Sequence, residues 1–287
     1  MSRFRRISIN QATIKHASLA TAITACNASG IESIGLWREP VAEVGLDEAV
    51  RLVADSGLRV SSYCRGGFLT SMDVRDRQRA LDDNFRAIEE TAALAAVGAP
   101  GSASVLVLVA GGLDPPSKDL AGARAMFEEG LARLEVAASA AGVTLAIEPL
   151  HPMYASDRAV VSTLGQALDL AENFAPDVVG VVIDAFHVWW DPDLSAQIDR
   201  AGRGNRIACY QVCDWSTPLG HDVLLSRHYP GDGVIDLRSL TRSVRSAGFA
   251  GDIEIEIFNE VVWNDDPKRV IERALVGIHH SVESNML

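Results

Sequence analysis

Positive charge, cysteine and long apolar runs are all scarce in this sequence, and each scarcity argues against a class of protein. Lysine and arginine total 26 against 38 aspartates and glutamates, which gives a formal net charge of −12. A nucleic-acid partner is not expected, because phosphate neutralisation needs a basic face and no basic patch stands out. Apolar residues make up 48% of the chain. No run of about 18 of them occurs, however, so no membrane span is expected.

The cysteines and the start of the chain bear on the cellular compartment. The cysteines are scattered, as is usual for reduced thiols in a cytoplasm, and they are Cys26, Cys64, Cys209 and Cys213. The start, MSRFRRISIN, is basic and passes directly into a strand-like pattern without a cleavable apolar region. A secretory signal is therefore not expected, and we expect a cytoplasmic protein.

Short β-rich runs alternate with amphipathic segments from end to end. Most of the β-rich runs are dense in valine, isoleucine and leucine, which is typical of parallel strands buried on both faces. The expected strands are Arg6–Thr13, Ile31–Trp37, Arg59–Cys64, Ser104–Ala110, Val143–Glu148, Val178–Asp184, Ile207–Cys213 and Asp252–Phe258. The expected helices include Leu46–Ser56, Arg75–Ala96, Leu120–Ala141, Thr163–Phe174, Leu237–Ala247 and Pro267–Ser284.

Local signals mark the ends of these helices. A glycine just before the next strand is a helix stop, and such glycines are Gly30, Gly57, Gly98, Gly142 and Gly248. Side chains that cap a helix start are expected at Ser18, Asp47 and Asp236.

The alternation predicts a closed (β/α)₈ barrel, or TIM barrel, because about eight βα units fill a chain of this length. We expect one domain over residues 1–287. An open, doubly wound sheet is the alternative, but it usually has fewer strands and a phosphate-binding glycine loop. Gly111-Gly112, after the fourth expected strand, is too short a signal for that loop.

Metal-capable side chains stand at the ends of four consecutive expected strands, where a barrel of this kind carries its functional residues. They are Glu148, Asp184, Gln211 and Glu256. A carboxylate among buried valines and isoleucines is costly unless it is paired or bound to a cation. An internal salt bridge explains one such residue equally well. Three on neighbouring strands, with no lysine or arginine interleaved, would repel one another unless a divalent cation neutralises them.

The choice of ligands and of metal follows from position and donor type. Glu254 shares a strand face with Glu256, and Glu256 is preferred because it lies nearer the strand end. Oxygen donors dominate the set, which favours Mn²⁺ or Mg²⁺ over a tetrahedral zinc site. The expected cofactor is one divalent metal, with Mn²⁺ first and Mg²⁺, Co²⁺ and Zn²⁺ as alternatives.

Other polar and aromatic residues also follow strand ends. His151, just past Glu148, is a rival candidate for the catalytic base. Arg227 could grip a hydroxyl, carboxylate or phosphate of a substrate, or be a surface arginine beside a tight turn. The tryptophans, with Trp215 as the candidate for substrate binding, could form an aromatic wall for a sugar ring. Core packing or a subunit contact is the alternative for each of Trp37, Trp189, Trp190, Trp215 and Trp263.

Several of these motifs resemble the xylose-isomerase-like superfamily of sugar isomerases and epimerases, in its branch related to inosose dehydratases and ketose epimerases. They are Glu148-Pro-Leu-His-Pro, Asp184-Ala-Phe-His187, Asp214-Trp215, Arg227 with Gly231-Asp232-Gly233, and Glu256-Ile-Phe. The resemblance covers nearly the whole chain. It implies one divalent metal, held by Glu148, Asp184, position 211 and Glu256. It also implies a substrate-binding role for His187, with packing or support of a ligand as the alternative.

Position 211 departs from the family pattern, because it is glutamine where many relatives have histidine. An amide oxygen is a harder and weaker donor than imidazole, so the preference should shift toward manganese or magnesium. The longer motifs around Glu148 and Asp184 also resemble, more loosely, the large subunits of enzymes that deglycosylate oxidised C-glycosides.

The expected function is that of a metal-dependent sugar isomerase or epimerase. The metal polarises a carbonyl or hydroxyl oxygen and so acidifies the neighbouring C–H, and Glu148, Glu256 or His151 takes the proton. The alternative is a lyase that eliminates the aglycone from a 3-oxo C-glycoside or dehydrates a keto-sugar, with a small partner subunit. The expected partners are otherwise a small sugar or glycoside and further copies of the chain.

Two more distant alternatives fit the sequence less well. A DNA-repair endonuclease of the same superfamily would need several more histidines for a multi-zinc cluster, together with a basic groove. A sugar-binding barrel without catalytic activity would not require three buried carboxylates.

Overall fold

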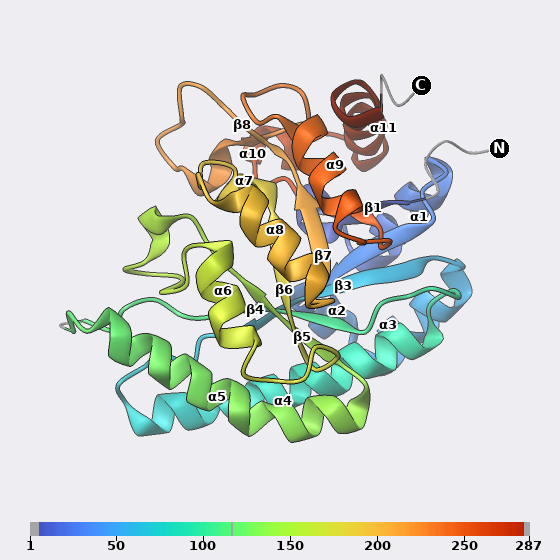
Figure 1. The fold of residues 1–287 in the computed structure, drawn as a ribbon. Coiled ribbons are helices and arrows are strands. Elements are labelled where there is room, and N and C mark those ends of the chain that lie inside the picture. Colours follow the sequence, from blue (N-terminus) through green and yellow to red (C-terminus); the bar gives the residue numbers. More distant parts are fainter. Residues whose placement is uncertain (1–5, 116, 284–287) are drawn as a thin grey trace.

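A closed barrel of eight parallel strands forms the centre of the molecule in the computed structural model, which describes residues 6–115 and 117–283 (Figure 1). The order around the barrel is β1-β10-β7-β6-β5-β4-β3-β2. The strands are β1 (Ile7–Asn10), β2 (Ser33–Trp37), β3 (Arg59–Gly67), β4 (Val105–Val109), β5 (Thr144–Glu148), β6 (Val179–Asp184), β7 (Ile207–Val212) and β10 (Ile253–Ile255). The prediction of a (β/α)₈ barrel is confirmed, and every expected strand contributes to it.

Helices surround the barrel, with α4 and α5 lying together along one side (Figure 1). The α-helices are α1 (Leu19–Ala28), α2 (Arg38–Val44), α3 (Leu46–Ser56), α4 (Val74–Val97), α5 (Leu120–Ala141), α6 (Leu164–Ala171), α7 (Ala185–Val188), α8 (Leu194–Arg203), α9 (Leu237–Ser246), α10 (Glu260–Trp263) and α11 (Pro267–Ile278). Shorter turns are the 3₁₀ helices η1 (Gln11–Ile14), η2 (Pro152–Tyr154) and η3 (Leu224–Ser226) and the π-helical η4 (His279–Glu283). No helix among the described residues combines the length and the apolar character that a membrane crossing requires.

The composition of the strands explains why they form a closed parallel sheet. All five residues of β4, the run VLVLV, are buried, and so are all six of β6. A strand buried on both faces needs apolar side chains on both. In this barrel one face meets the interior and the other meets the helices.

Most of the expected helix signals act as caps. The side chains of Ser18 and Asp236 accept hydrogen bonds from backbone N–H groups at the starts of α1 and α9. Gly57 and Gly142 end α3 and α5 in the left-handed conformation, which glycine adopts without steric cost. The expectation for Asp47 is wrong, because it lies in the first turn of α3, whose cap is Gly45.

Several element ends differ from the expected ones. The first strand stops at Asn10 because the Asn10 side chain accepts a hydrogen bond from the Ala12 N–H and starts η1. Helix α6 ends at Ala171, and α11 gives way to η4 at His279, while Ser284 lies outside the described residues. A short antiparallel pair, β8 (Asp214–Trp215) and β9 (Arg227–His228), was not expected at all.

The buried face of α5 gives a direct test of the packing between helices and barrel. Phe127 is fully buried in α5, whereas Val136 in the same helix is 76% exposed. We expect Phe127→Ala to lower the free energy of unfolding by about 3–5 kcal/mol, because it removes buried apolar surface and leaves a cavity. Val136→Ala should change it by less than about 0.5 kcal/mol. Urea unfolding measures both, and equal effects would contradict this packing.

Candidate metal centre and substrate cavity

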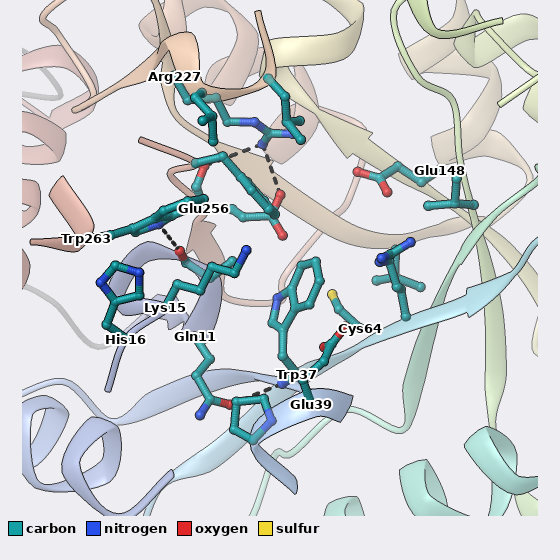
Figure 2. A pocket seen from close by; sticks show the side chains of 18 of the residues that line it. Gln11, Lys15, His16, Trp37, Glu39, Cys64, Glu148, Arg227, Glu256 and Trp263 are labelled. Carbon is teal, nitrogen blue, oxygen red and sulfur yellow. Dashed lines mark hydrogen bonds and ion pairs between the residues drawn. The ribbon is translucent and has the colours of Figure 1, made fainter. Parts of the chain in front are cut away.

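A cavity of about 840 Å³ lies at the C-terminal ends of the barrel strands. Its polar wall includes Glu148, His187, Arg227 and Glu256. Its apolar wall is formed largely by Trp37, Phe68, Val109, Leu150, Leu225, Phe258 and Trp263. Figure 2 shows the carboxylates of Glu148 and Glu256 directed into the same space, with Arg227 beside Glu256. The volume and the mixture of apolar walls with a few converging polar groups are typical of a small-molecule site.

Three buried carboxylates meet at the polar end of this cavity. Glu148 is the last residue of β5, Asp184 the last of β6, and Glu256 directly follows β10. They are 7%, 0% and 4% exposed. Donor atoms of Glu148, Asp184 and His187 lie within 4.8 Å of one another. Donor atoms of Glu256 form a second such group with those of Glu254 and Cys64, and Arg227 contacts both groups through Asp184 and Glu256.

The electrostatics of this cluster oppose three separate negative charges. Burial, together with the charge of Asp184, raises the pKa of Glu148 to about 8. Burial raises the pKa of Asp184, although the positive charge of Arg227 opposes the shift. Burial also raises the pKa of Glu256 well above its usual range, against the attraction of Arg227. The cluster thus carries more carboxylate charge than its protein surroundings neutralise.

Arg227 supplies the protein's own cation to the cluster. Its Nη1 lies 2.9 Å from Asp184 Oδ2 and 2.9 Å from Glu256 Oε2. The guanidinium is 4.6 Å from the ring centre of Phe186 and 5.0 Å from that of Phe258, so two aromatic faces hold it. Arg227 is 2% exposed, which excludes the surface alternative. One guanidinium faces three carboxylates, so the internal salt bridge accounts for only part of their charge.

His187 faces the cavity as a neutral ring. Its Nδ1 accepts a hydrogen bond from the backbone N–H of His151 at 3.2 Å. Burial and the charge of Arg227 lower its pKa well below the usual range. Nε2 is 3.0 Å from Nη2 of Arg227. A guanidinium can only donate, so both ring nitrogens face N–H donors, which compete for the single lone-pair acceptor of a neutral imidazole.

Gln211 lies beneath the carboxylates with its amide orientation fixed. Its Nε2 donates to Glu254 Oε1 at 2.9 Å and lies 3.5 Å from Glu256 Oε1. The reverse orientation would set the amide oxygen against carboxylate oxygens, so the geometry determines which atom is which. Gln211 Oε1 is buried and has no hydrogen-bond partner among the described residues. A buried acceptor without a partner is costly.

Glu254 lies in a deeper layer of the barrel, with donor atoms within 4.8 Å of those of Glu256 and Cys64. It is fully buried, and its carboxylate accepts hydrogen bonds from the side chains of Asn10, Ser61, Ser62 and Gln211. Four neutral donors stabilise a buried carboxylate without a cation. The sequence already favoured Glu256 over Glu254 as a ligand, and the structure gives Glu254 a different position, behind Gln211.

The comparisons with known proteins agree with this fold. The family model described as "Xylose isomerase-like TIM barrel" matches residues 23–276. The chain belongs to this family. A crystal structure of protein SMc04130 from Sinorhizobium meliloti 1021 has a TM-score of 0.91 at 47% identity, covering 97% of this chain and 98% of that one. A structure of IolI protein with a bound zinc atom has a TM-score of 0.80 at 20% identity, covering 96% and 98%, and shares the fold.

Curated relatives of this family member match over part of their length. An inosose isomerase from Halalkalibacterium halodurans is 25% identical over 161 residues, which are 54% of this chain and 55% of that protein. A 3-dehydroshikimate dehydratase from Pseudomonas aeruginosa is 31% identical over 150 residues, which are 50% of this chain and 22% of that protein. The chain spans about half the length of the inosose isomerases it matches.

Two of the expected site residues stand behind the cavity wall of this family member. The His151 ring packs against Trp190 and Trp215, and its Nδ1 accepts from the Met153 N–H, so it caps η2. The Trp215 ring packs 4.8 Å from that of Phe186. Neither residue lines the cavity. The sequence could not separate them from the cavity residues, because all follow strand ends.

Some of the tryptophans form part of the cavity wall, and others pack behind it. Trp37 and Trp263 line the cavity, and each indole N–H is anchored, to Asn10 Oδ1 and to the Ala12 carbonyl respectively. Trp189 packs on Trp215 and belongs to the support behind the wall. Fixed indoles of this kind form a rigid aromatic surface.

A substitution at Gly35 tests the contacts that surround the Glu254 carboxylate. A Cβ added at Gly35 would lie 2.6 Å from Glu254 Oε2, so Gly35→Ala should displace the carboxylate from its donors. We expect a loss of about 1–3 kcal/mol in the free energy of unfolding, measured by urea titration. In Gly165→Ala of α6 the nearest atom is a flexible Gln197 side-chain carbon at 3.3 Å. That control should be neutral or stabilising by up to about 1 kcal/mol, and an equally tolerated Gly35→Ala would contradict the described contact.

Proposed function

We propose that this protein is a divalent-metal-dependent sugar isomerase or epimerase that moves a proton beside a carbonyl carbon. The observation that carries the proposal is the set of three buried carboxylates around Arg227, together with the buried amide oxygen of Gln211, which has no partner among the described residues. Inosose isomerases among the relatives support the same class of reaction.

The donor set fits a hard divalent cation. Glu148, Asp184 and Glu256 offer carboxylate oxygens, and Gln211 offers the amide oxygen that lacks a partner. Such oxygen ligands suit Mn²⁺ or Mg²⁺, and Mn²⁺ is the first choice, with Co²⁺ and Zn²⁺ as alternatives. When bound, the cation polarises a substrate carbonyl and makes the neighbouring C–H more acidic.

The protein's own residues would divide the remaining tasks. Glu148 ends β5 and Glu256 follows β10, and both point into one space, so one can take a proton from carbon while the other, protonated, delivers its own proton to the opposite face. The Arg227 guanidinium, beside the His187 ring, would donate to a substrate oxygen. The aromatic walls would exclude water from the reacting carbon.

An elimination is the second candidate reaction. The 3-dehydroshikimate dehydratases among the relatives favour it, since a dehydration also begins with loss of a proton beside a carbonyl. The elimination of an aglycone from a 3-oxo C-glycoside starts in the same way, with a small partner subunit as a further component. For the isomerase we propose further copies of the chain as partners.

Deuterium exchange tests the shared step. Metal-loaded protein incubated with candidate ketoses in D₂O should incorporate deuterium at the carbon beside the carbonyl. Glu148→Gln and Glu256→Gln should each lower the exchange rate by about 10²-fold or more, because each removes an acid–base group. They should also lower the bound metal measured by elemental analysis.

The control for this experiment is a carboxylate away from the cavity. Glu129→Gln, on the exposed face of α5, should leave exchange and metal content unchanged. Full exchange and full metal content in both Glu148→Gln and Glu256→Gln would show that the site is wrongly assigned. Release of water or an aglycone in place of an epimer would select the elimination.

Gln211 tests the metal preference. Gln211→His replaces an amide oxygen by imidazole, whose ring N–H can still donate to Glu254. We expect the affinity for Zn²⁺ relative to Mn²⁺ to rise by about tenfold or more, measured by competition with a chromophoric chelator. Gln211→Ala should weaken both metals alike. A ratio unchanged in Gln211→His would mean that position 211 is not a ligand.

A further inference from the structure

Arg65 lines the same cavity as Arg227, the arginine of the carboxylate cluster. It approaches the cavity from a different side. It lies in β3, directly after Cys64, and it is half-buried. It lines the cavity together with Glu148. Its guanidinium carbon is 4.8 Å from the ring centre of Phe68 and 5.7 Å from that of Trp37. The two aromatic rings limit where this charge can move.

The charge on Arg65 has no acceptor among the residues that the structure describes. Other partly or fully buried arginines are paired: Arg38 with Asp83 and Glu90, and Arg227 with Asp184 and Glu256. Within residues 6–115 and 117–283, Arg65 makes no ion pair and no hydrogen bond. A half-buried guanidinium that has lost part of its hydration gains most from a bidentate anionic acceptor. The cavity is where such an acceptor would sit.

The distance between this cation and the reacting groups suits a small molecule. Strand β4 separates β3 from β5, with Gly67 paired to Val109 and Val109 paired to Glu148. Adjacent strands are about 4.8 Å apart, so Arg65 and Glu148 stand on strands roughly 10 Å apart at one end of the barrel. Arg65 is also close enough for its charge to lower the pKa of Glu148, against the dominant effect of burial. Both side chains line the same cavity, so a sugar-sized molecule bound there can contact both.

The other charged residues on the rim differ from Arg65. Lys15 is exposed and lies 4.5 Å from the Trp263 ring centre, and Figure 2 shows it on the other side of the view from Glu148. Arg158 already faces Asp157 at 3.7 Å. Glu39 also lines the cavity without an ion pair to Arg65. Arg65 is thus the cation best placed to bind one end of a ligand whose other end lies at Glu148.

We propose that Arg65 binds an anionic group, a carboxylate or a phosphate monoester, at the end of the sugar-derived substrate remote from the carbon that loses its proton. The inference rests on the proposed function for the identity of the reacting end. The expected substrate is then a sugar acid, a cyclic keto acid or a sugar phosphate. A neutral sugar should bind less tightly.

Three matched ligands test the anionic subsite. D-glucose, D-glucuronate and D-glucose 6-phosphate share a ring and differ at one end, and their dissociation constants are measured by NMR titration, with and without prior treatment with a metal chelator. We expect at least one of the anions to bind about tenfold or more tightly than glucose. The anion that binds more tightly than glucose shows whether the subsite takes a carboxylate or a phosphate. Arg65→Gln should abolish the preference, Arg65→Lys should retain part of it, and Arg133→Gln, on the exposed face of α5, should retain all of it.

The outcomes separate this subsite from the metal-dependent reaction. No preference for either anion in the wild-type protein, or a preference that survives Arg65→Gln, overturns the proposal. If the preference for an anion survives Arg65→Gln but disappears with the chelator, the anion binds at the metal centre, and the proposal for Arg65 is overturned as well. If the wild-type protein shows no deuterium exchange but does show an anion preference that depends on Arg65, the proposed function is rejected and the anionic subsite is retained.

Discussion

Electrostatic repulsion among Glu148, Asp184 and Glu256 is the constraint that organises this end of the barrel. Each carboxylate ends or follows a buried strand, so closure of the barrel forces the three into one region of low dielectric constant. Arg227 neutralises part of their charge and is itself held between Phe186 and Phe258. A cluster with this excess of negative charge favours a bound cation or a shared proton.

The layer beneath the cluster shows a different solution for a buried carboxylate. Glu254 is surrounded by neutral donors and takes no cation from the protein, and Gly35 leaves the space that its carboxylate occupies. The same carboxylate accepts from Gln211 and thereby turns the amide oxygen away from itself. Glu254 and Glu256, only two residues apart, therefore have different roles. Glu256 lines the cavity, and Glu254 fixes the orientation of the Gln211 amide.

The cavity combines a polar end for chemistry with apolar walls for exclusion of water. Trp37 and Trp263 are fixed by hydrogen bonds from their indole nitrogens, so the aromatic surface is rigid. An isomerisation and an elimination place the same demands on this geometry as far as the first proton transfer. They differ in where the electrons go afterwards, which depends on the leaving group that the substrate carries and therefore on what the rest of the cavity binds. Arg65, which lines the cavity together with Glu148, is one of the groups that can bind the rest of the substrate.

The sequence by itself determined the eight strands, the barrel and the strand ends that carry Glu148, Asp184, Gln211 and Glu256, because dense apolar runs and capping signals are local and parallel strands end on one side. It could not determine how residues distant in the chain would meet. Arg227 comes from the unexpected β8–β9 pair, and its contacts with Asp184 and Glu256 span 43 and 29 residues. His151 and Trp215 share their strand-end positions with the cavity residues, and only side-chain packing turned them behind the wall. Closure of the barrel, which sets β10 between β1 and β7, decided the roles of Glu254 and Gln211, because their partners lie on neighbouring strands that the linear sequence separates.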